Sequence, residues 1–409
     1  MAVKAPPPPV DQPSDQSWHA TFNSEVQYYS WSSSQGYPAL PLQVPPDPRG
    51  PGKGSQVYIP YALQLDGSPT NDLQAQFLVR SGYVSSRQTT AGISASADTP
   101  TDTTVGTTWT YNGIAGLQPF ASVNVNAPTG KTVLLGNIAL ARPDPYLAGV
   151  PTFGEGWNIG PTLGFNVPIT TDLVASLSGG FTSRGSYNRE GVIPLVGMQG
   201  ITSINPGDDT TVNSSIAYQK NGLSLQGSVA YTWETQTTIG GAPVYKTGNA
   251  VTFSGSAGYA WNPAWSSQLL ASFTHTDRNL AQNLVQPPVL LVSQVANSNS
   301  DITQLLFSTT YTQGPFAIGP TAKFIYRNHN DWDPTSSQFL PAATFWAAGA
   351  MAQYNVTKQL SLTARVERRW LFEDMNPDKL TNIGILAGSG FPAISSNGWM
   401  ASLGGTAKF

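Results

Sequence analysis

The sequence has no cysteine, three histidines and few charged residues: Lys, Arg, Asp and Glu make up 11% of its 409 positions. Without cysteine the chain can form no disulfide, thiolate metal ligand or cysteine nucleophile. His19, His275 and His329 stand far apart and give no metal-binding spacing, so we expect no metal site and no cofactor. The net charge of -3 argues against a nucleic-acid partner.

Long apolar runs and catalytic motifs are also missing. No segment approaches the roughly 18 uninterrupted apolar residues of a membrane-spanning helix, and phosphate-loop, dinucleotide and serine-hydrolase motifs are absent. His275 shares an alternating face with Leu269, Ala271 and Phe273, but no serine stands two residues after it as a partner nucleophile. We therefore predict that the protein is not an enzyme.

What the chain has in quantity is glycine, aromatic and hydroxyl residues, with 40 Gly, 11 Trp, 16 Tyr and 16 Phe. This composition favours strands and turns over helices. The last stretch, 398–409, shows the pattern most clearly, because its alternate positions form an apolar and a mostly polar face. The apolar face consists of Trp399, Ala401, Leu403, Gly405, Ala407 and Phe409. Such alternation is typical of a strand between two different solvents.

Segments of this kind recur along the whole chain, and a tilted strand needs about 9–11 residues to cross a membrane. About sixteen are predicted, at 18–30, 57–65, 73–83, 105–111, 115–127, 157–167, 173–183, 212–218, 223–233, 251–261, 265–275, 302–311, 316–328, 342–354, 360–370 and 398–409.

The connections between these segments alternate strictly between short and long. Short turns occur at 67–70, 112–113, 170–171, 220–222, 262–263, 313–315 and 355–358, and Asn-Gly at 221–222 is a strong hairpin signal. Long connections occupy 33–54, 84–102, 128–156, 184–209, 236–248, 277–300, 329–340 and 372–397. A soluble β-sandwich would not place eight long loops on one side. We therefore predict a transmembrane, antiparallel, up-and-down β-barrel with turns at one end and loops at the other.

Aromatic residues on the apolar faces gather at both ends of the predicted strands, as two membrane-interface girdles require. They include Trp233, Trp261, Trp265, Tyr354, Trp370, Trp399 and Phe409. The terminal Phe409 resembles the closing residue of outer-membrane β-barrels of Gram-negative bacteria. That resemblance implies periplasmic turns, extracellular loops, contact with outer-membrane lipid and lipopolysaccharide, and recognition of Phe409 by the barrel-insertion machinery.

The domain organisation is a short tail followed by the barrel. Residues 1–16 are predicted to form a Pro-rich periplasmic tail and residues 17–409 the barrel. No apolar signal segment follows Met1, so we expect the sequence to be a mature form with an added start Met.

The polar faces should line the lumen, where most side chains are uncharged. Lys323, Arg327, Arg365, Glu367 and Arg369 are the exception. Two interpretations remain open: an ion-pair network that fills the wall, or a basic strip that attracts anions or carboxylate-bearing solutes. Further candidate lumen charges are Glu25, Arg80 and Glu234.

The connection 128–156 is unusually apolar for a loop in water. Its apolar residues include Leu134, Leu135, Ile138, Leu140, Tyr146 and Leu147. We predict that they fold into the barrel mouth as a constriction that favours apolar or aromatic solutes. The alternative is a loop that only covers the rim. Residues 285–292 could help to close the same mouth.

Pro128-Thr129-Gly130 together with residues 154–165 resembles a barrel family associated with meta-pathway phenol degradation. The resemblance implies an outer-membrane channel for aromatic compounds and transfers no catalytic residues. Our prediction is a channel for passive or facilitated uptake of small solutes, leaning to apolar or aromatic, in part carboxylated, compounds. The alternatives are a general diffusion porin, a structural or surface-binding barrel, and the barrel component of an export or conduction complex. Whether copies of the chain associate stays open.

Overall fold

The computed structural model describes residues 18–34, 51–90, 92–133, 141, 154–193, 198–282, 290–334, 336, 338–374 and 393–409. Every named element in these ranges is a β-strand. None of the described residues lies in a helix long and apolar enough to cross a membrane. The predicted tail, 1–16, lies outside the described residues.

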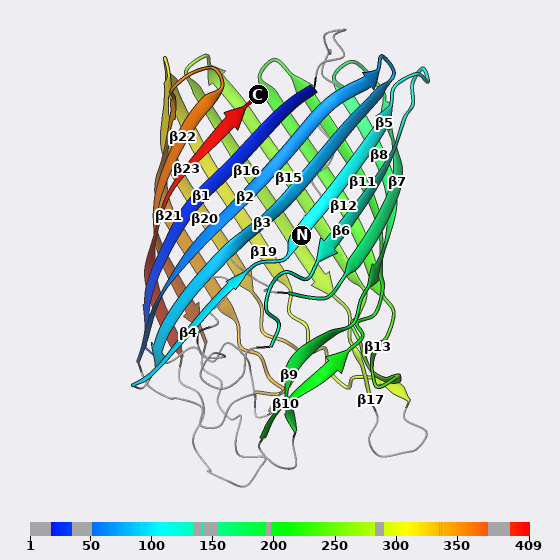
Figure 1. Ribbon diagram of the computed structural model, residues 1–409, viewed down its shortest axis with the longest axis vertical. Coiled ribbons are helices and arrows are strands. Elements are labelled where there is room, and N and C mark those ends of the chain that lie inside the picture. The colour runs from blue at the N-terminus through cyan, green and yellow to red at the C-terminus, as the bar shows by residue number, and fades with distance from the viewer. Residues whose placement is uncertain are drawn as a thin grey trace.

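Sixteen strands pair in sequence order, each antiparallel to the next, and the last pairs with the first (Figure 1). The largest sheet has a seventeenth strand, β4, which pairs with β3 alone. The barrel strands are β1 (Trp18–Ser33), β2 (Gly52–Thr70), β3 (Leu73–Thr90), β5 (Thr103–Tyr111), β6 (Gln118–Ala127), β7 (Asn158–Pro168), β8 (Leu173–Arg184), β11 (Asp209–Lys220), β12 (Leu223–Glu234), β15 (Ala250–Asn262), β16 (Trp265–Thr276), β19 (Ile302–Gln313), β20 (Phe316–Arg327), β21 (Ala343–Asn355), β22 (Leu360–Glu373) and β23 (Ile394–Lys408). The predicted closed barrel and its strand count are confirmed.

All short turns lie at one end of the barrel, together with the C-terminus (Figure 1). Phe409 is tied to the first strand there, because its amide donates to the Ala20 carbonyl at 2.8 Å and its carbonyl accepts from the Ala20 amide at 3.1 Å. The predicted hairpin at Asn221 and Gly222 lies at this same end, with positive φ angles of 50° and 78°. We call this the turn end and the opposite one the loop end.

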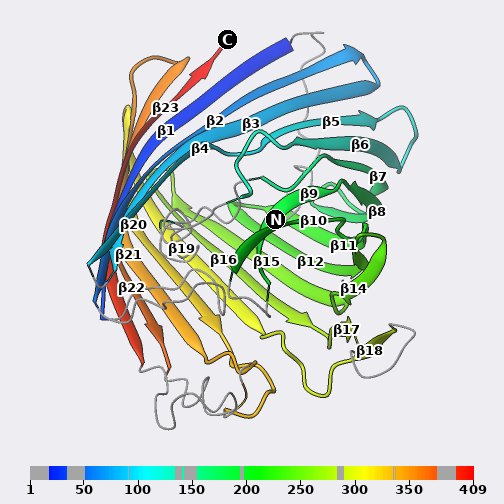
Figure 2. The ribbon, with the colours of Figure 1, turned by 60° about the horizontal axis from the view of Figure 1, so that its bottom comes forward.

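The long connections contain strands that the sequence pattern did not predict. β3 continues to Thr90 and forms a hairpin with β4 (Ile93–Pro100), inside the range predicted as a loop. β9 (Tyr187–Ile193) pairs with β10 (Met198–Ile204), and β13 (Thr237–Ile239), β14 (Ala242–Lys246), β17 (Leu280–Gln282) and β18 (Leu291–Ser293) form a small sheet. Figure 2 shows these elements at the loop end. Strands beyond the membrane do not need an apolar face, so period-2 alternation does not mark them.

Side-chain exposure separates the two faces of the barrel strands. On β23, Trp399 and Leu403 point outward and are 51% and 64% exposed, whereas the inward Met400 is fully buried. The predicted girdle residues lie on outward faces, and aromatic pairs such as Phe316–Tyr354 and Trp265–Tyr311 stack across neighbouring strands with ring centroids 4.6 and 4.9 Å apart. The apolar surface of the barrel therefore faces outward, as it must in a bilayer.

Candidate functional site in the barrel lumen

The inner surface of the barrel has two chemically different halves. The neutral wall, formed by β5 to β8, β11, β12, β15, β16 and β19, carries mainly Ser, Thr, Asn, Gln and Gly inward. In these described strands the inward charges are Arg184, Asp209 and Glu234, all at the loop end, where Arg184 lies 2.8 Å from Glu234 and 3.6 Å from Asp209. The charged wall, formed by β20 to β23 and β1 to β3, carries all five predicted lumen charges on inward faces.

The charged wall is thickened toward the loop end by a buried apolar cluster that points into the barrel. Its members are Tyr29, Trp31, Ile325, Ala343, Phe345, Ala347, Leu371 and Met400. Phe345, at 1% exposure, is the largest fully buried side chain of the barrel. The Trp31 ring lies flat on Gly54, where any side chain would collide with it. This half of the wall therefore contains a core, although it faces the lumen.

Glu367 and Arg369 are embedded in that cluster. The Arg369 Nη2 and Nε atoms donate to Glu367 Oε2 at 2.8 and 3.1 Å, and both residues are less than one-tenth exposed. The Arg369 guanidinium also lies over the Tyr29 ring, 4.7 Å from its centroid. A buried charge needs such partners. For these two residues the geometry favours the wall-filling interpretation of the charged strip.

Arg365 and Arg327 are also engaged by acidic groups. The Arg365 guanidinium lies 3.7 Å from Glu367 and 3.9 Å from Glu25. Arg327 lies 3.1 Å from Glu373 and donates to the Pro341 carbonyl at 3.0 Å. Two of the five predicted selectivity residues thus share their charge with carboxylates.

Lys323 differs from the other four residues. Among the described residues, no carboxylate lies within 4.0 Å of its Nζ atom, which is 5.7 Å from the centroid of the Phe345 ring. On the neighbouring strands Lys323 pairs with Leu306, which in turn pairs with Leu270. Both leucines face the lumen and are 41% and 37% exposed. We call Lys323, Leu306 and Leu270 the ammonium-leucine patch.

Sequence reasoning found the lysine of this patch and missed its leucines. Leu269 and Leu270 are adjacent in sequence, and so are Leu305, Leu306 and Phe307, so the apolar residues fall on both faces. Period-2 alternation cannot assign an inward apolar residue in such a run. The signal that could have indicated the inward leucines is that the alternation of apolar and polar residues is interrupted on two neighbouring strands.

The predicted constriction residues Leu134, Leu135, Ile138, Leu140, Tyr146 and Leu147 lie outside the described residues. Ala141, a described residue of the same connection, is fully buried. It packs against the inward Ala95 and Ala97 of β4, and its carbonyl accepts a 2.6 Å hydrogen bond from the Ser86 hydroxyl. At this residue the connection contacts the inner face of the β3–β4 hairpin.

Asp102 joins the two ends of the same connection. Its carboxylate accepts hydrogen bonds from the Gly130 and Glu155 amides, both at 3.0 Å, and from the Asn126 side chain at 2.8 Å. Gly154 sits so close to the Gly130 carbonyl that a side chain would collide with it. The Gly-rich residues behind the family resemblance therefore form the base of this loop.

His275, for which the sequence predicts no catalytic role, faces outward near the loop end. Its Nδ1 lies 2.7 Å from Asp301 and its Nε2 lies 3.6 Å from Asp277. In the described part of the chain no group of three His, Cys, Asp or Glu residues has metal-binding geometry.

A closed sixteen-stranded barrel with an outward apolar surface and a mostly polar interior defines a porin-like outer-membrane β-barrel. No protein-family model and no curated protein matches the chain. Among solved structures, it is similar to an outer-membrane channel from Pseudomonas putida F1 (16% identity, 62% of this chain and 88% of that one, TM-score 0.37), to a mutant of the Rh. blastica porin (12%, 96% and 99%, 0.35) and to OccK7 from Pseudomonas aeruginosa (9%, 96% and 98%, 0.43). Likenesses at this level concern the barrel architecture alone.

Proposed function

We propose that the barrel is a channel for uptake of small solutes, with a preference for compounds that combine an apolar or aromatic body with a carboxylate. The observation that carries the proposal is the ammonium-leucine patch, in which a lumen-facing ammonium with no carboxylate of the described residues within 4.0 Å lies beside two exposed leucines. The patch thus presents a positive charge and an apolar surface side by side in a lumen that is mostly polar.

The electrostatics of the patch support an anionic solute. Arg365 and Arg369 share their charge with Glu25 and Glu367, whereas the half-buried Lys323 has no carboxylate of the described residues within 4.0 Å. A cation beside low-dielectric side chains attracts an anion more strongly than one in bulk water. The exposed Leu306 and Leu270 would cover the apolar part of the same solute, at roughly 25 cal/mol per Å² of apolar surface removed from water.

The neutral wall supports release of the solute. Its hydroxyl and amide groups offer weak, replaceable hydrogen bonds, and passage requires binding that is weak enough for the solute to leave. A lumen with one patch of this kind and a neutral opposite wall therefore suits facilitated diffusion.

The test is solute flux into proteoliposomes with four solutes: benzoate, benzyl alcohol, acetate and glucose. We expect benzoate to enter faster than the other three. Lys323→Gln should remove the advantage of benzoate over benzyl alcohol, and Leu306→Ser should remove its advantage over acetate. Lys220→Gln is the matched control, because Lys220 lies at a turn and pairs with Asp172 at 3.0 Å; it should leave all four rates unchanged.

Entry of all four solutes at rates that depend only on their size would refute the preference and identify a general diffusion porin. If no solute enters although the barrel is folded, the channel function itself is wrong. In that case the alternatives are a structural or surface-binding barrel, or one part of an export or conduction complex.

A further inference from the structure

Three cations point away from the barrel near its loop end, and all lie in one sector of the wall. They are Lys53 on β2, Arg87 on β3 and Arg368 on β22. In the described barrel strands, the other outward cation is Lys220, which lies at the turn end. The outward surface of a membrane barrel contacts lipid. A group of cations in one sector of that surface can therefore bind an anionic group of the surrounding lipid.

Arg368 lies within the lipid-facing band itself. On the outward face of β22 it stands between Val366 and Trp370. Its guanidinium lies over the Trp399 ring, 5.0 Å from the centroid, and donates to the Asn397 side chain at 2.6 Å. Among the described residues no carboxylate lies within 4.0 Å of it. Arginine on a lipid-facing surface is tolerated near the interface, where it can reach headgroups.

Lys53 and Arg87 lie on neighbouring strands, beyond the edge of the apolar band that is nearer to the loop end. Arg87 pairs with Ser55, and Lys53 pairs with Thr89, so the two cations are diagonal neighbours on one face. Both are exposed, and within the described part of the chain neither has a carboxylate within 4.0 Å. Two cations this close together attract an anion more strongly than either would alone.

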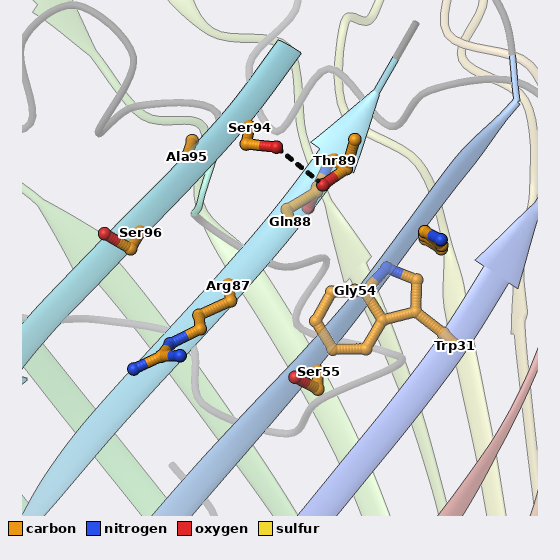
Figure 3. A pocket seen from close by; sticks show the side chains of 10 residues that line it. Trp31, Gly54, Ser55, Arg87, Gln88, Thr89, Ser94, Ala95 and Ser96 are labelled. Carbon is orange, nitrogen blue, oxygen red and sulfur yellow. Dashed lines mark hydrogen bonds between the residues drawn. The ribbon is translucent and has the colours of Figure 1, made fainter. Parts of the chain in front are cut away.

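An open hollow of about 620 Å³ lies at this pair. Besides the two cations, its outward lining residues carry hydroxyls: Ser55, Thr89, Ser94 and Ser96. The other lining residues belong to the inward positions of the same strands and are Trp31, Gly54, Gln88 and Ala95. Figure 3 shows Arg87 and Ser55 on adjacent strands and the 3.0 Å hydrogen bond that joins Thr89 to Ser94.

A single row of paired residues joins the hollow to Arg368. It runs through Arg368, Trp399, Ser30, Ser55, Arg87 and Ser96. Between the cations this row offers serine hydroxyls and one tryptophan. On the described strands of the sector, the acidic residue of the outward face is Asp98, which pairs with Ser85. Three cations against one carboxylate leave the outward face of these strands positive.

We propose that this sector, the outward loop-end face of β22, β23 and β1 to β4, binds the phosphorylated headgroup of an outer-leaflet glycolipid. One phosphate lies in the hollow between Lys53 and Arg87, and a second anionic group lies at Arg368. The serine and threonine hydroxyls contact sugar hydroxyls, and the acyl chains lie along the apolar band on the side of the turn end. Charge complementarity and direct continuity with the lipid-facing band favour this occupant, and the row of hydroxyls favours a sugar headgroup over a simple phospholipid.

The test is native mass spectrometry of the purified barrel in detergent, titrated with bisphosphorylated lipid A, dephosphorylated lipid A or phosphatidylglycerol. We expect bisphosphorylated lipid A to bind most tightly. Arg368→Gln should weaken its binding by about fivefold and the double variant Lys53→Gln/Arg87→Gln by about 25-fold, because each cation near a membrane surface contributes a similar factor. Lys220→Gln, an outward cation at the opposite end, should leave binding unchanged.

Folding of each variant is checked by the mobility difference between heated and unheated samples on gels. Three results would overturn the proposal: unchanged lipid A binding by the folded double variant, equal binding of both forms of lipid A, or equal binding of phosphatidylglycerol. Crosslinking between copies of the chain through an introduced cysteine, Ser96→Cys, would instead identify the sector as a contact with a second barrel.

Discussion

The charged wall and the neutral wall are built from the same antiparallel strands but use their inward positions differently. On the charged wall, Phe345 and Leu371 are 1% exposed and Glu367 is 7% exposed. On the neutral wall, inward residues such as Ser224 and Gly258 are small, and the Ser224 hydroxyl donates a single hydrogen bond to the Gly258 carbonyl at 3.4 Å. One half of this barrel therefore has a core inside the lumen, whereas the other half is a single layer.

The boundary between the walls can be followed along one row of paired residues. From the charged to the neutral wall it reads Arg369, Ala347, Lys323, Leu306, Leu270, Ser256 and Gln226. The row begins at Arg369, which is paired with a carboxylate, and continues to Lys323, which has no carboxylate within 4.0 Å in the described part of the chain. It then passes through the two leucines to neutral polar groups. The ammonium-leucine patch thus lies where the two walls meet.

The largest effect is expected from removing the core of the charged wall. Phe345→Ala should lower the free energy of unfolding by about 4 kcal/mol, because a fully buried aromatic ring leaves a cavity. Urea unfolding in detergent micelles, followed by tryptophan fluorescence, measures the change. Ser228→Ala, an inward change on the neutral wall, is the control and should cost less than about 0.5 kcal/mol. Equal losses for the two variants would show that the walls do not differ in packing.

The next effect concerns the buried ion pair. Glu367→Gln should cost about 2 kcal/mol, because Arg369 would keep its buried charge and lose the carboxylate that accepts its two hydrogen bonds. The same unfolding assay applies. Glu234→Gln is the matched control: Glu234 also binds an arginine at 2.8 Å, but its partner Arg184 is 22% exposed and also faces Asp209. A larger loss for Glu234→Gln would contradict the comparison.

The sequence predicted the barrel well because the membrane imposes one rule on every strand. The alternation of 398–409 and the Asn-Gly turn at 221–222 are local signals, and the structure confirms both. The inward cluster was not predictable in this way. Tyr29 and Trp31 on β1 meet Phe345 on β21 and Leu371 on β22 only after the barrel closes. Likewise the partners of Arg365 lie on its own strand and on β1, more than three hundred residues away.

A smaller and more local effect is expected at Asp102, at the rim beside the neutral wall. Asp102→Ala should remove three hydrogen bonds that join the ends of the connection 128–156. We expect a loss of about 1 kcal/mol in global stability but a clear increase in protease cleavage within this connection. Limited proteolysis followed by mass spectrometry measures it. Asp172→Ala, at a turn on the opposite end, should leave the cleavage pattern unchanged. Unaltered cleavage in Asp102→Ala would show that the carboxylate does not hold the loop.

The smallest change in stability, and a direct test of the boundary between the walls, is expected from adding a cation to the neutral wall. Gln226→Lys places an ammonium in the same row as Lys323, separated from it by Ser256, Leu270 and Leu306. Because the side chain at 226 faces a polar lumen without a packed core, the free energy of unfolding should change by less than about 0.5 kcal/mol. The permeability ratio of chloride to potassium in planar bilayers should rise, since a second lumen cation adds to the attraction of anions. At high ionic strength the increase should shrink because salt screens the added charge. A stability loss comparable to that of Phe345→Ala would instead mean that the neutral wall is packed as tightly as the charged one.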